Sequence, residues 1–288
     1  MSQAALRRPP DAMRALTLPD EADASRLADL LRDAAGLSLP RGSAPLVAAR
    51  LGPRLRRLGF DSFGAYVAML GRERGGELQM AVDLLTTQET CFFREPEQFE
   101  WLEAELSRQR PLRLRLWSAA TSFGDEAYSL AMLLADLQRA GRIGADWSVL
   151  GTDVGGHRLQ VAATALYPPA RLRLVTPERQ RLYCLAGATP MGLVQMQAGL
   201  RERVRFHAHR LRDALAASEL FDVILLRHAL VYFDTAARQA IVAAMLARLQ
   251  PGGLLVVASE EARLVAVPNA RALAPGVFRK GEGALRRA

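Results

Sequence analysis

Four short apolar runs separated by helical stretches constrain the fold of residues 111–282 more than any other feature of the chain. The runs have the length and composition of strands, and they read LRLRLW (112–117), WSVLGT (147–152), FDVILLR (221–227) and GLLVVAS (253–259). The stretches between them have apolar residues at helical spacing and cover 126–138, 157–165 and 235–249. Strands that alternate with helices predict a parallel sheet covered on both faces, which is a doubly wound α/β domain. We expect a Pro-Gly-Gly turn at 251–253 before the last strand.

The chain before residue 86 follows another pattern, a succession of apolar stripes at helical spacing. The stripes cover 24–34, 46–58, 63–70 and 78–85. Gly36 supplies a stop signal after the first stripe, and Pro53 lies inside the second, where a helix either kinks or begins. We therefore expect an all-α N-terminal domain over residues 18–85, followed by a linker over 86–110.

The second of these helices carries a basic face formed by Arg50, Arg54, Arg56 and Arg57. The chain as a whole has a net charge of +8, which comes from arginine because Lys280 is the only lysine. An arginine-rich surface suits nucleic acid, anionic lipid or a carboxylate-rich protein. Arginine richness also follows the base composition of a genome, and on that explanation the arginines of this helix form only a solvated surface.

The remaining composition excludes several classes of protein. No apolar run reaches the roughly 18 residues that span a bilayer, and the first residues lack the apolar core of a signal peptide. Cys91 and Cys184 lie far apart without CxxC spacing, so neither a zinc site nor a disulfide framework is indicated. We expect a cytoplasmic protein without membrane insertion and without a bound metal.

Acidic residues follow the first two strands, at the edge of the sheet where ligands of such folds bind. In SAATSFGDEAYSL (118–130), Gly124 permits close approach of a ligand, and Asp125 and Glu126 open the next helix. Two acids there disfavour a phosphate and suit an ammonium group or sugar hydroxyls, although plain helix capping explains them equally well.

Asp153 follows the second strand in GTDV (151–154), where an acid commonly accepts hydrogen bonds from both hydroxyls of a ribose. Taken alone, Asp153 also fits a cap of the following helix. The two loops together favour S-adenosylmethionine over a dinucleotide, since neither GxGxxG nor GxxxxGK[ST] occurs.

The run FDVILLRHALVYFD (221–234) adds Arg227, His228 and Tyr232 to the same edge of the sheet. His228 is either catalytic or a residue that lines the site. We favour a lining role, because the sequence shows no carboxylate partner for the imidazole.

Several long blocks in this order resemble the chemotaxis-receptor methyltransferases of the CheR family. The blocks are TTQETCFFREPEQF (86–99), WSAATSFGDEAYSLAMLLAD (117–136), TDVGGHRL (152–159), FDVILLRHALVYFD (221–234) and LQPGGLLVVASEE (249–261). The resemblance implies an all-α N-terminal domain and a Rossmann-like methyltransferase domain with a small inserted β-subdomain near residues 190–200. It also implies S-adenosylmethionine as methyl donor, S-adenosylhomocysteine as product, and glutamate side chains on the cytoplasmic helices of methyl-accepting receptors as acceptors. We expect a monomer.

The resemblance also assigns roles to individual residues. Phe92 and Phe93 are expected to pack in the core, and Arg94 and Tyr232 to orient the acceptor carboxylate and the methyl group. The four arginines of the basic helix would contact the receptor. The positions expected to contact the cofactor are Gln88, Thr90, Arg94, Glu126, Asp153, Arg210, Leu211, Arg227 and His228.

The sequence departs from the family pattern around the cofactor. Asparagines usual in the family are replaced by Gln88, Arg210 and His228, an aromatic residue by Cys91, and a small loop residue by Phe123. Two hypotheses follow: an active glutamate O-methyltransferase with a divergent pocket, and a non-catalytic signalling module that keeps the fold. A nucleic-acid methyltransferase fits less well, because the aromatic-rich motif of base-flipping enzymes is absent from the sequence.

Overall fold

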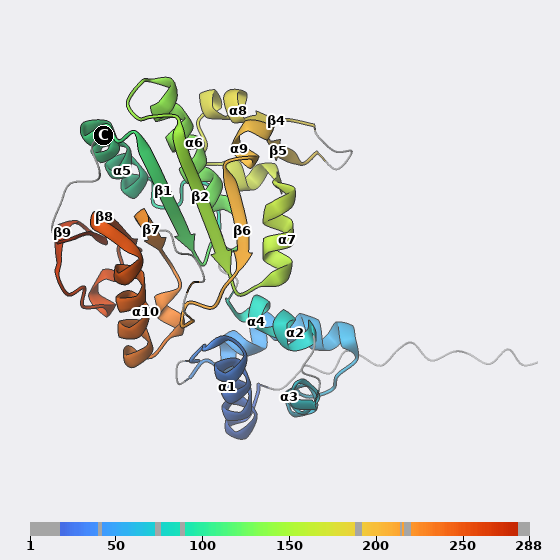
Figure 1. Ribbon diagram of the computed structural model, residues 1–288. Coiled ribbons are helices and arrows are strands. Elements are labelled where there is room, and N and C mark those ends of the chain that lie inside the picture. The colour runs from blue at the N-terminus through green and yellow to red at the C-terminus, as the bar shows by residue number, and fades with distance from the viewer. Residues whose placement is uncertain are drawn as a thin grey trace, which may run out of the picture. The chain divides into compact units, whose positions relative to one another are not determined.

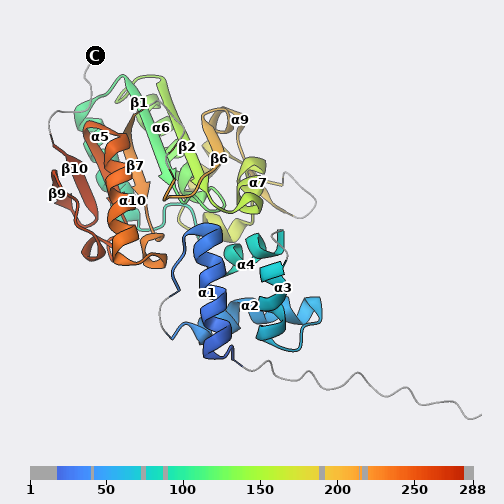
Figure 2. The ribbon, with the colours of Figure 1, turned by 60° about the horizontal axis from the view of Figure 1, so that its bottom comes forward.

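The computed structural model describes residues 18–39, 42–72, 76–86, 90–187, 192–213, 215 and 220–281. The chain forms two compact units, of which the first ends at Thr86 and the second begins at Thr87. Both are shown in Figures 1 and 2.

The first unit consists of helices. They are α1 (Glu21–Ala35), α2 (Ala44–Leu58), α3 (Phe63–Arg72) and α4 (Gly76–Thr86). Asp20 caps α1 by accepting a hydrogen bond from the Asp23 amide, and Gly36 ends the helix in a left-handed conformation, as its sequence position predicts. The second helix continues through Pro53, so the alternative that it begins there is wrong.

The apolar stripes of these helices meet in one core. Its largest fully buried side chains are Leu27, Leu31, Leu51, Leu55, Tyr66, Leu70 and Leu85. Spacing of three and four residues places the apolar side chains of each helix on one side. Burial of that side stabilises helices that are too short to be stable in isolation.

The second unit is built on a seven-stranded sheet with the order β6-β2-β1-β7-β8-β10-β9. The strands are β1 (Arg113–Ala119), β2 (Asp146–Asp153), β6 (Val204–Ala208), β7 (Phe221–Leu226), β8 (Leu249–Val257), β9 (Ala270–Ala274) and β10 (Val277–Lys280). Five strands of this sheet, β1, β2, β6, β7 and β8, are parallel to one another. The strand β10 pairs antiparallel with both β8 and β9. The predicted doubly wound α/β fold is confirmed, and the predicted strands are parallel; the antiparallel strands β9 and β10, which the sequence analysis did not identify, extend the sheet beyond β8.

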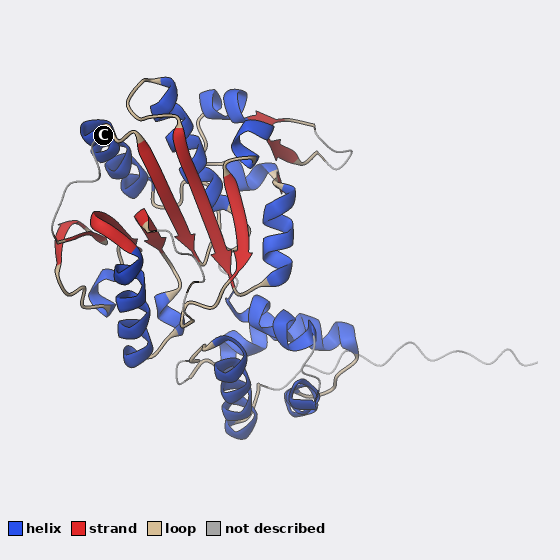
Figure 3. Cartoon of the chain, in the orientation of Figure 1, coloured by secondary structure: helices blue, strands red, loops and turns tan. Residues whose placement is uncertain are grey.

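Helices cover both faces of the sheet, as Figure 3 shows with strands in red and helices in blue. They are α5 (Pro96–Gln109), α6 (Asp125–Arg139), α7 (Gly156–Thr164) and α10 (Thr235–Arg248). Val223 and Leu225 of β7 belong to the core that contains α5 and α6. Ile224 and Leu226 are also fully buried and point to the other face, because side chains alternate along a strand.

A second, three-stranded antiparallel sheet is inserted between α7 and β6. It comprises β3 (Leu166–Tyr167), β4 (Cys184–Leu185) and β5 (Val194–Met196), together with η1 (Pro169–Leu172), α8 (Pro177–Tyr183) and α9 (Ala198–Arg201). The sequence located this insertion near 190–200. The structure places β5 there and shows that the inserted segment starts earlier, at Leu166.

The Pro-Gly-Gly segment is not the turn that the sequence predicts. The strand β8 already begins at Leu249, and its register with β7 shifts, since Phe221 pairs with Leu249 but Val223 pairs with Leu254. Residues 251–253 therefore form an irregularity within the strand, with Gly252 in the left-handed region at φ 77°.

Two short 3-10 turns complete the unit, η2 (Leu230–Tyr232) and η3 (Ala262–Leu264). In the ranges described above, no helix combines the length and the apolar character needed to cross a membrane.

Candidate active site

The order of the strands reverses at β1, whose neighbours are β2 on one side and β7 on the other. Ligands of doubly wound sheets bind beyond the carboxyl ends of the strands at such a point. The loop after β1 is tightly folded there, with positive φ angles at Ala120 (65°), Ser122 (53°) and Gly124 (87°). A side chain at Gly124 would approach the Tyr167 hydroxyl to 2.9 Å, so this position requires glycine.

Asp153, at the end of β2, is buried and holds this loop. Its Oδ2 accepts a hydrogen bond from the Ser122 amide at 2.9 Å, and its Oδ1 accepts one from the Gly155 amide at 2.8 Å. Arg158 of α7 lies 2.7 Å from the same Oδ1, and both of these side chains are almost fully buried. Both oxygens of Asp153 therefore already accept a hydrogen bond from the backbone.

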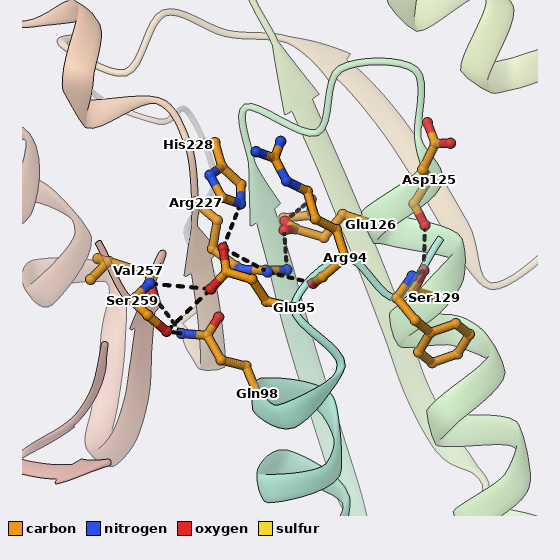
Figure 4. A network of polar contacts seen from close by, with 12 residues as sticks. Arg94, Glu95, Gln98, Asp125, Glu126, Ser129, Arg227, His228, Val257 and Ser259 are labelled. Carbon is orange, nitrogen blue, oxygen red and sulfur yellow. Dashed lines mark hydrogen bonds and ion pairs between the residues drawn. The ribbon is translucent and has the colours of Figure 1, made fainter. Parts of the chain in front are cut away.

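Glu126, in the first turn of α6, is the second acid of the site. Ser118 of β1 donates its hydroxyl to Oε1 at 2.7 Å. Arg227 lies 3.2 Å from Oε2, and Figure 4 shows these two side chains together. Both contacts fix the carboxylate at the carboxyl end of the central strands, and each oxygen retains acceptor capacity.

The first acid of the pair, Asp125, is turned into the protein and is fully buried. Its Oδ2 accepts a hydrogen bond from Arg171 of η1 at 2.9 Å. The Thr90 side chain also donates a hydrogen bond to this carboxylate. Burial raises the pKa of Asp125, and the charge of Arg171 opposes this shift. The Arg171 guanidinium also lies 4.4 Å above the Phe123 ring, so this bulky substitution packs against a cation from the inserted segment.

Arg227 links the end of β7 to the segment that precedes α5. Its guanidinium is buried, donates to the Arg94 carbonyl, and lies 3.5 Å from Glu95 Oε1 in addition to its contact with Glu126. It also lies 5.4 Å above the Phe99 ring. Arg227 therefore joins residues 94–95 to α6 (Figure 4).

Residues 93–98 are held from several elements at once. The Phe93 amide donates to Ser129 of α6 at 2.9 Å, and the Gln98 amide group donates to the Val257 carbonyl at 2.9 Å. Phe93 and Glu95 both have positive φ, 52° and 56°, which is uncommon for residues other than glycine. This strained turn brackets Arg94, and such strain persists only where the surroundings hold it in place.

His228 has a carboxylate partner, contrary to the expectation from the sequence. Its Nε2 lies 2.7 Å from Glu95 Oε1, and its own amide donates to Oε2 of the buried Glu261 at 2.7 Å. The second oxygen of Glu95 accepts from Ser259. Burial alone would raise the pKa of Glu95, but the bond with His228 and the charge of Arg227 outweigh it and lower that pKa to about 2.

The other residues singled out by the sequence are distributed as follows. Phe92 and Phe93 are buried in the core as predicted, and Tyr232 is half-buried in η2. Arg210 is exposed after β6, whereas Leu211 is buried. Gln88 lies outside the described residues.

The four arginines of the basic helix lie in the first unit. Arg50 donates to the Leu85 carbonyl, and Arg54 is paired with Glu77. Arg56 and Arg57 are exposed.

Sequence reasoning missed Glu95, Arg158 and Arg171. Glu95 directly follows Arg94 but its partners are more than 130 residues away. Arg158 occupies a position on the apolar side of its helix, beside Leu159 and Ala162, and that placement is a recognisable signal of a buried pair.

The donor set fits S-adenosylmethionine. Glu126 and Asp153 supply carboxylate oxygens, which suit an ammonium group and ribose hydroxyls, at the ends of neighbouring strands. Among the described residues, no group of three or more His, Cys, Asp and Glu side chains is arranged to hold a metal ion.

Two family models match the chain. Residues 88–271 match the model described as "CheR methyltransferase, SAM binding domain", and residues 22–86 match "CheR methyltransferase, all-alpha domain". The second unit is thus a Rossmann-like methyltransferase unit whose cofactor is S-adenosylmethionine, as the sequence predicted.

Curated relatives match over most of their length. Three are named "Chemotaxis protein methyltransferase": those of Salmonella typhimurium (34% identical), Escherichia coli (35%) and Klebsiella aerogenes (36%). The first two alignments cover 82% of this chain and 82% of the relative, and the third covers 87% of each. The chain belongs to the CheR methyltransferase family, which confirms the resemblance seen in the sequence.

Proposed function

We propose that the protein transfers the methyl group of S-adenosylmethionine to glutamate side chains of methyl-accepting chemotaxis receptors, which gives glutamate methyl esters. The relatives are named as chemotaxis protein methyltransferases, which supports the proposal. The observation that carries the proposal is the strained turn around Arg94. Arg227 contacts both the Arg94 carbonyl and Glu126 and so holds this turn beside Glu126. An arginine side chain is thereby placed near the carboxylates at the strand ends.

The reaction requires positioning more than proton transfer. An ordinary glutamic acid has a pKa of about 4.3, so the acceptor is already a carboxylate at neutral pH and needs no general base. The cofactor supplies an electrophilic methyl group on a sulfonium. The protein has to align the acceptor with that methyl group and exclude water, and alignment alone contributes a large part of such rate enhancements.

We assign roles to the site residues on this basis. Arg94 orients the acceptor carboxylate through its guanidinium, together with Tyr232. Glu126 holds the ammonium group of the cofactor, and Asp153 holds the ribose. The further residues proposed to line the cofactor are Gln88, Thr90, Arg210, Leu211, Arg227 and His228.

We assign receptor recognition to the helical unit, residues 18–85. Arg56 and Arg57 are the members of its basic face that are exposed, which suits an acidic receptor helix. Arg50 and Arg54 have partners within the unit and support its packing.

The test is a methylation assay with receptor cytoplasmic fragments and S-adenosylmethionine labelled in its methyl group. We expect label on the fragment that alkali releases as methanol, because methyl esters hydrolyse under conditions that leave N-methyl groups intact. A receptor fragment with its acceptor glutamates changed to glutamine is the matched control and should take up no label. Label that resists alkali would contradict glutamate as the acceptor.

The alternative, a non-catalytic module, is an outcome of the same assay combined with a cofactor titration. Two of the residues that depart from the family pattern pack within the protein: Cys91 is buried, and the Phe123 ring packs against Arg171. These substitutions therefore do not by themselves remove the cofactor. Cofactor binding without any transfer to receptor fragments would favour the module.

A further inference from the structure

A buried arginine contacts the carboxylate proposed to hold the ribose. Arg158 is in the first turn of α7, and its side chain is 4% exposed. Its Nη2 lies 2.7 Å from Oδ1 of Asp153, whose side chain is 5% exposed. A guanidinium is rarely placed in such surroundings without a carboxylate partner, because its desolvation is costly.

The contacts of Asp153 determine how much of its acceptor capacity remains. A carboxylate offers about four acceptor positions, two on each oxygen. On Oδ1 the Gly155 amide donates at 2.8 Å, and the Arg158 guanidinium lies as an ion-pair partner 2.7 Å from the same atom. On Oδ2 one is taken, by the Ser122 amide at 2.9 Å. Among the contacts that the described residues make, one position on Oδ2 is left for a ligand.

A ribose presents two neighbouring hydroxyls, and a carboxylate that binds both needs two free positions. We propose that Arg158 restricts Asp153 to a single ribose hydroxyl of the cofactor, which donates to Oδ2, and that the other hydroxyl is not held by this carboxylate. Arg158 is then a positioning residue that determines which ribose hydroxyl of the cofactor the site recognises. This inference rests on the proposed placement of the ribose at Asp153.

The unequal use of the two hydroxyls can be measured on the unmodified protein. The probes are S-adenosylhomocysteine and its 2′-deoxy and 3′-deoxy analogues, titrated by calorimetry. We expect one analogue to bind about tenfold or more weakly, as for loss of a hydrogen bond to a charged group, and the other to bind within about threefold of the parent.

A substitution of Arg158 supplies the second arm. Arg158→Met keeps the length of the side chain but frees one acceptor position on Oδ1. The analogue that was tolerated by the wild type should then also lose affinity relative to the parent ligand. Arg158→Lys retains a cation and should preserve the wild-type pattern, and His157→Met, at the exposed neighbouring position, is the matched control.

The possible results separate this inference from the proposed site. Equal weakening of both analogues in the wild type, or an unchanged pattern in Arg158→Met, would overturn the role of Arg158 while leaving the ribose at Asp153. No weakening of either analogue would instead remove the ribose from Asp153. The wild-type comparison stands even if Arg158→Met does not fold.

Discussion

The guanidinium of Arg54 forms a two-point ion pair with Glu77, with Nε 3.0 Å from Oε1 and Nη2 2.5 Å from Oε2. Tyr66 donates its hydroxyl to Oε1 of the same carboxylate at 2.8 Å. The bond with Arg54 is the main cause that lowers the pKa of Glu77. Arg54 therefore serves the packing of α2 on α3 and α4, and the proposed receptor contact is assigned to the exposed arginines Arg56 and Arg57.

The double variant Arg56→Glu/Arg57→Glu should weaken receptor association roughly tenfold at low salt, because two exposed attractive contacts become repulsive. Cofactor affinity should not change. The wild-type interaction should also weaken between low and physiological salt, since exposed charges are screened within about 8 Å at 0.15 M. The measurement is a receptor-binding titration across a salt series.

Two controls accompany this experiment. Arg26→Glu/Arg72→Glu makes the same charge change at other exposed positions of the helical unit and should leave association closer to wild type. Arg54→Met should instead lower the stability of the unit to urea. Salt-insensitive association, or equal losses in both double variants, would show that the basic helix is not the contact surface.

Asp153→Asn should reduce affinity for S-adenosylmethionine about tenfold, the loss expected when a hydrogen bond to a charged acceptor is weakened. Calorimetry measures it directly. Asp146→Asn is the control at the opposite end of the same strand, where the side chain is 61% exposed. Unchanged affinity in Asp153→Asn would exclude this carboxylate from the cofactor site.

Tyr232→Phe should bind the cofactor as the wild type does and transfer the methyl group more slowly, by roughly tenfold or more. The hydroxyl is proposed to act on the alignment of the reacting groups, and such a contact affects the transition state more than ground-state binding. Single-turnover kinetics at saturating cofactor provide the measurement. A normal single-turnover rate would reduce Tyr232 to a packing residue.

Glu95→Gln should destabilise the protein at neutral pH, and the difference from wild type should shrink on acidification. The pKa of Glu95 is lowered from 4.5 to about 2, so the folded state binds its proton less readily than the unfolded state does. The stabilisation is therefore fully present above about pH 4.5 and is lost as the pH falls towards 2. Urea unfolding of both proteins at several pH values measures this trend.

The exposed Glu97, two residues further along, supplies the control Glu97→Gln. It should differ little from wild type at any pH in the series. A stability difference for Glu95→Gln that stays constant between neutral pH and about pH 3 would contradict the stabilising contacts of the Glu95 carboxylate with His228 and Arg227.

The sequence predicts the local parts of this structure well. Apolar spacing locates α1 to α4, because each of these helices buries one side. Short continuous apolar runs locate the central strands, because these strands are buried on both faces. The irregularity at 251–253 could not be predicted, since Pro-Gly-Gly usually forms a turn and only the pairing of β8 with β7 draws it into the strand.

The partners of site residues are the part that the sequence predicts least. Asp153 and Glu126 were recognisable from their positions after strands. Glu95 was not recognisable as the partner of His228, because the pair forms only when the segment before α5 packs on the end of β7. Periodicity carries no information about such long-range contacts.

The ion pair of Asp153 with Arg158 also limits the order in which this sequence could have evolved. Removal of one member of a buried pair typically costs about 3–5 kcal/mol, a large part of the roughly 5–15 kcal/mol that keeps a domain folded. An arginine at position 158 is therefore tolerated far better when an acid is already present at 153. While Arg158 is kept, loss of that acid destabilises the fold whether or not the protein transfers methyl groups. Stability alone would thus retain the acid at 153 in a chain that carries Arg158.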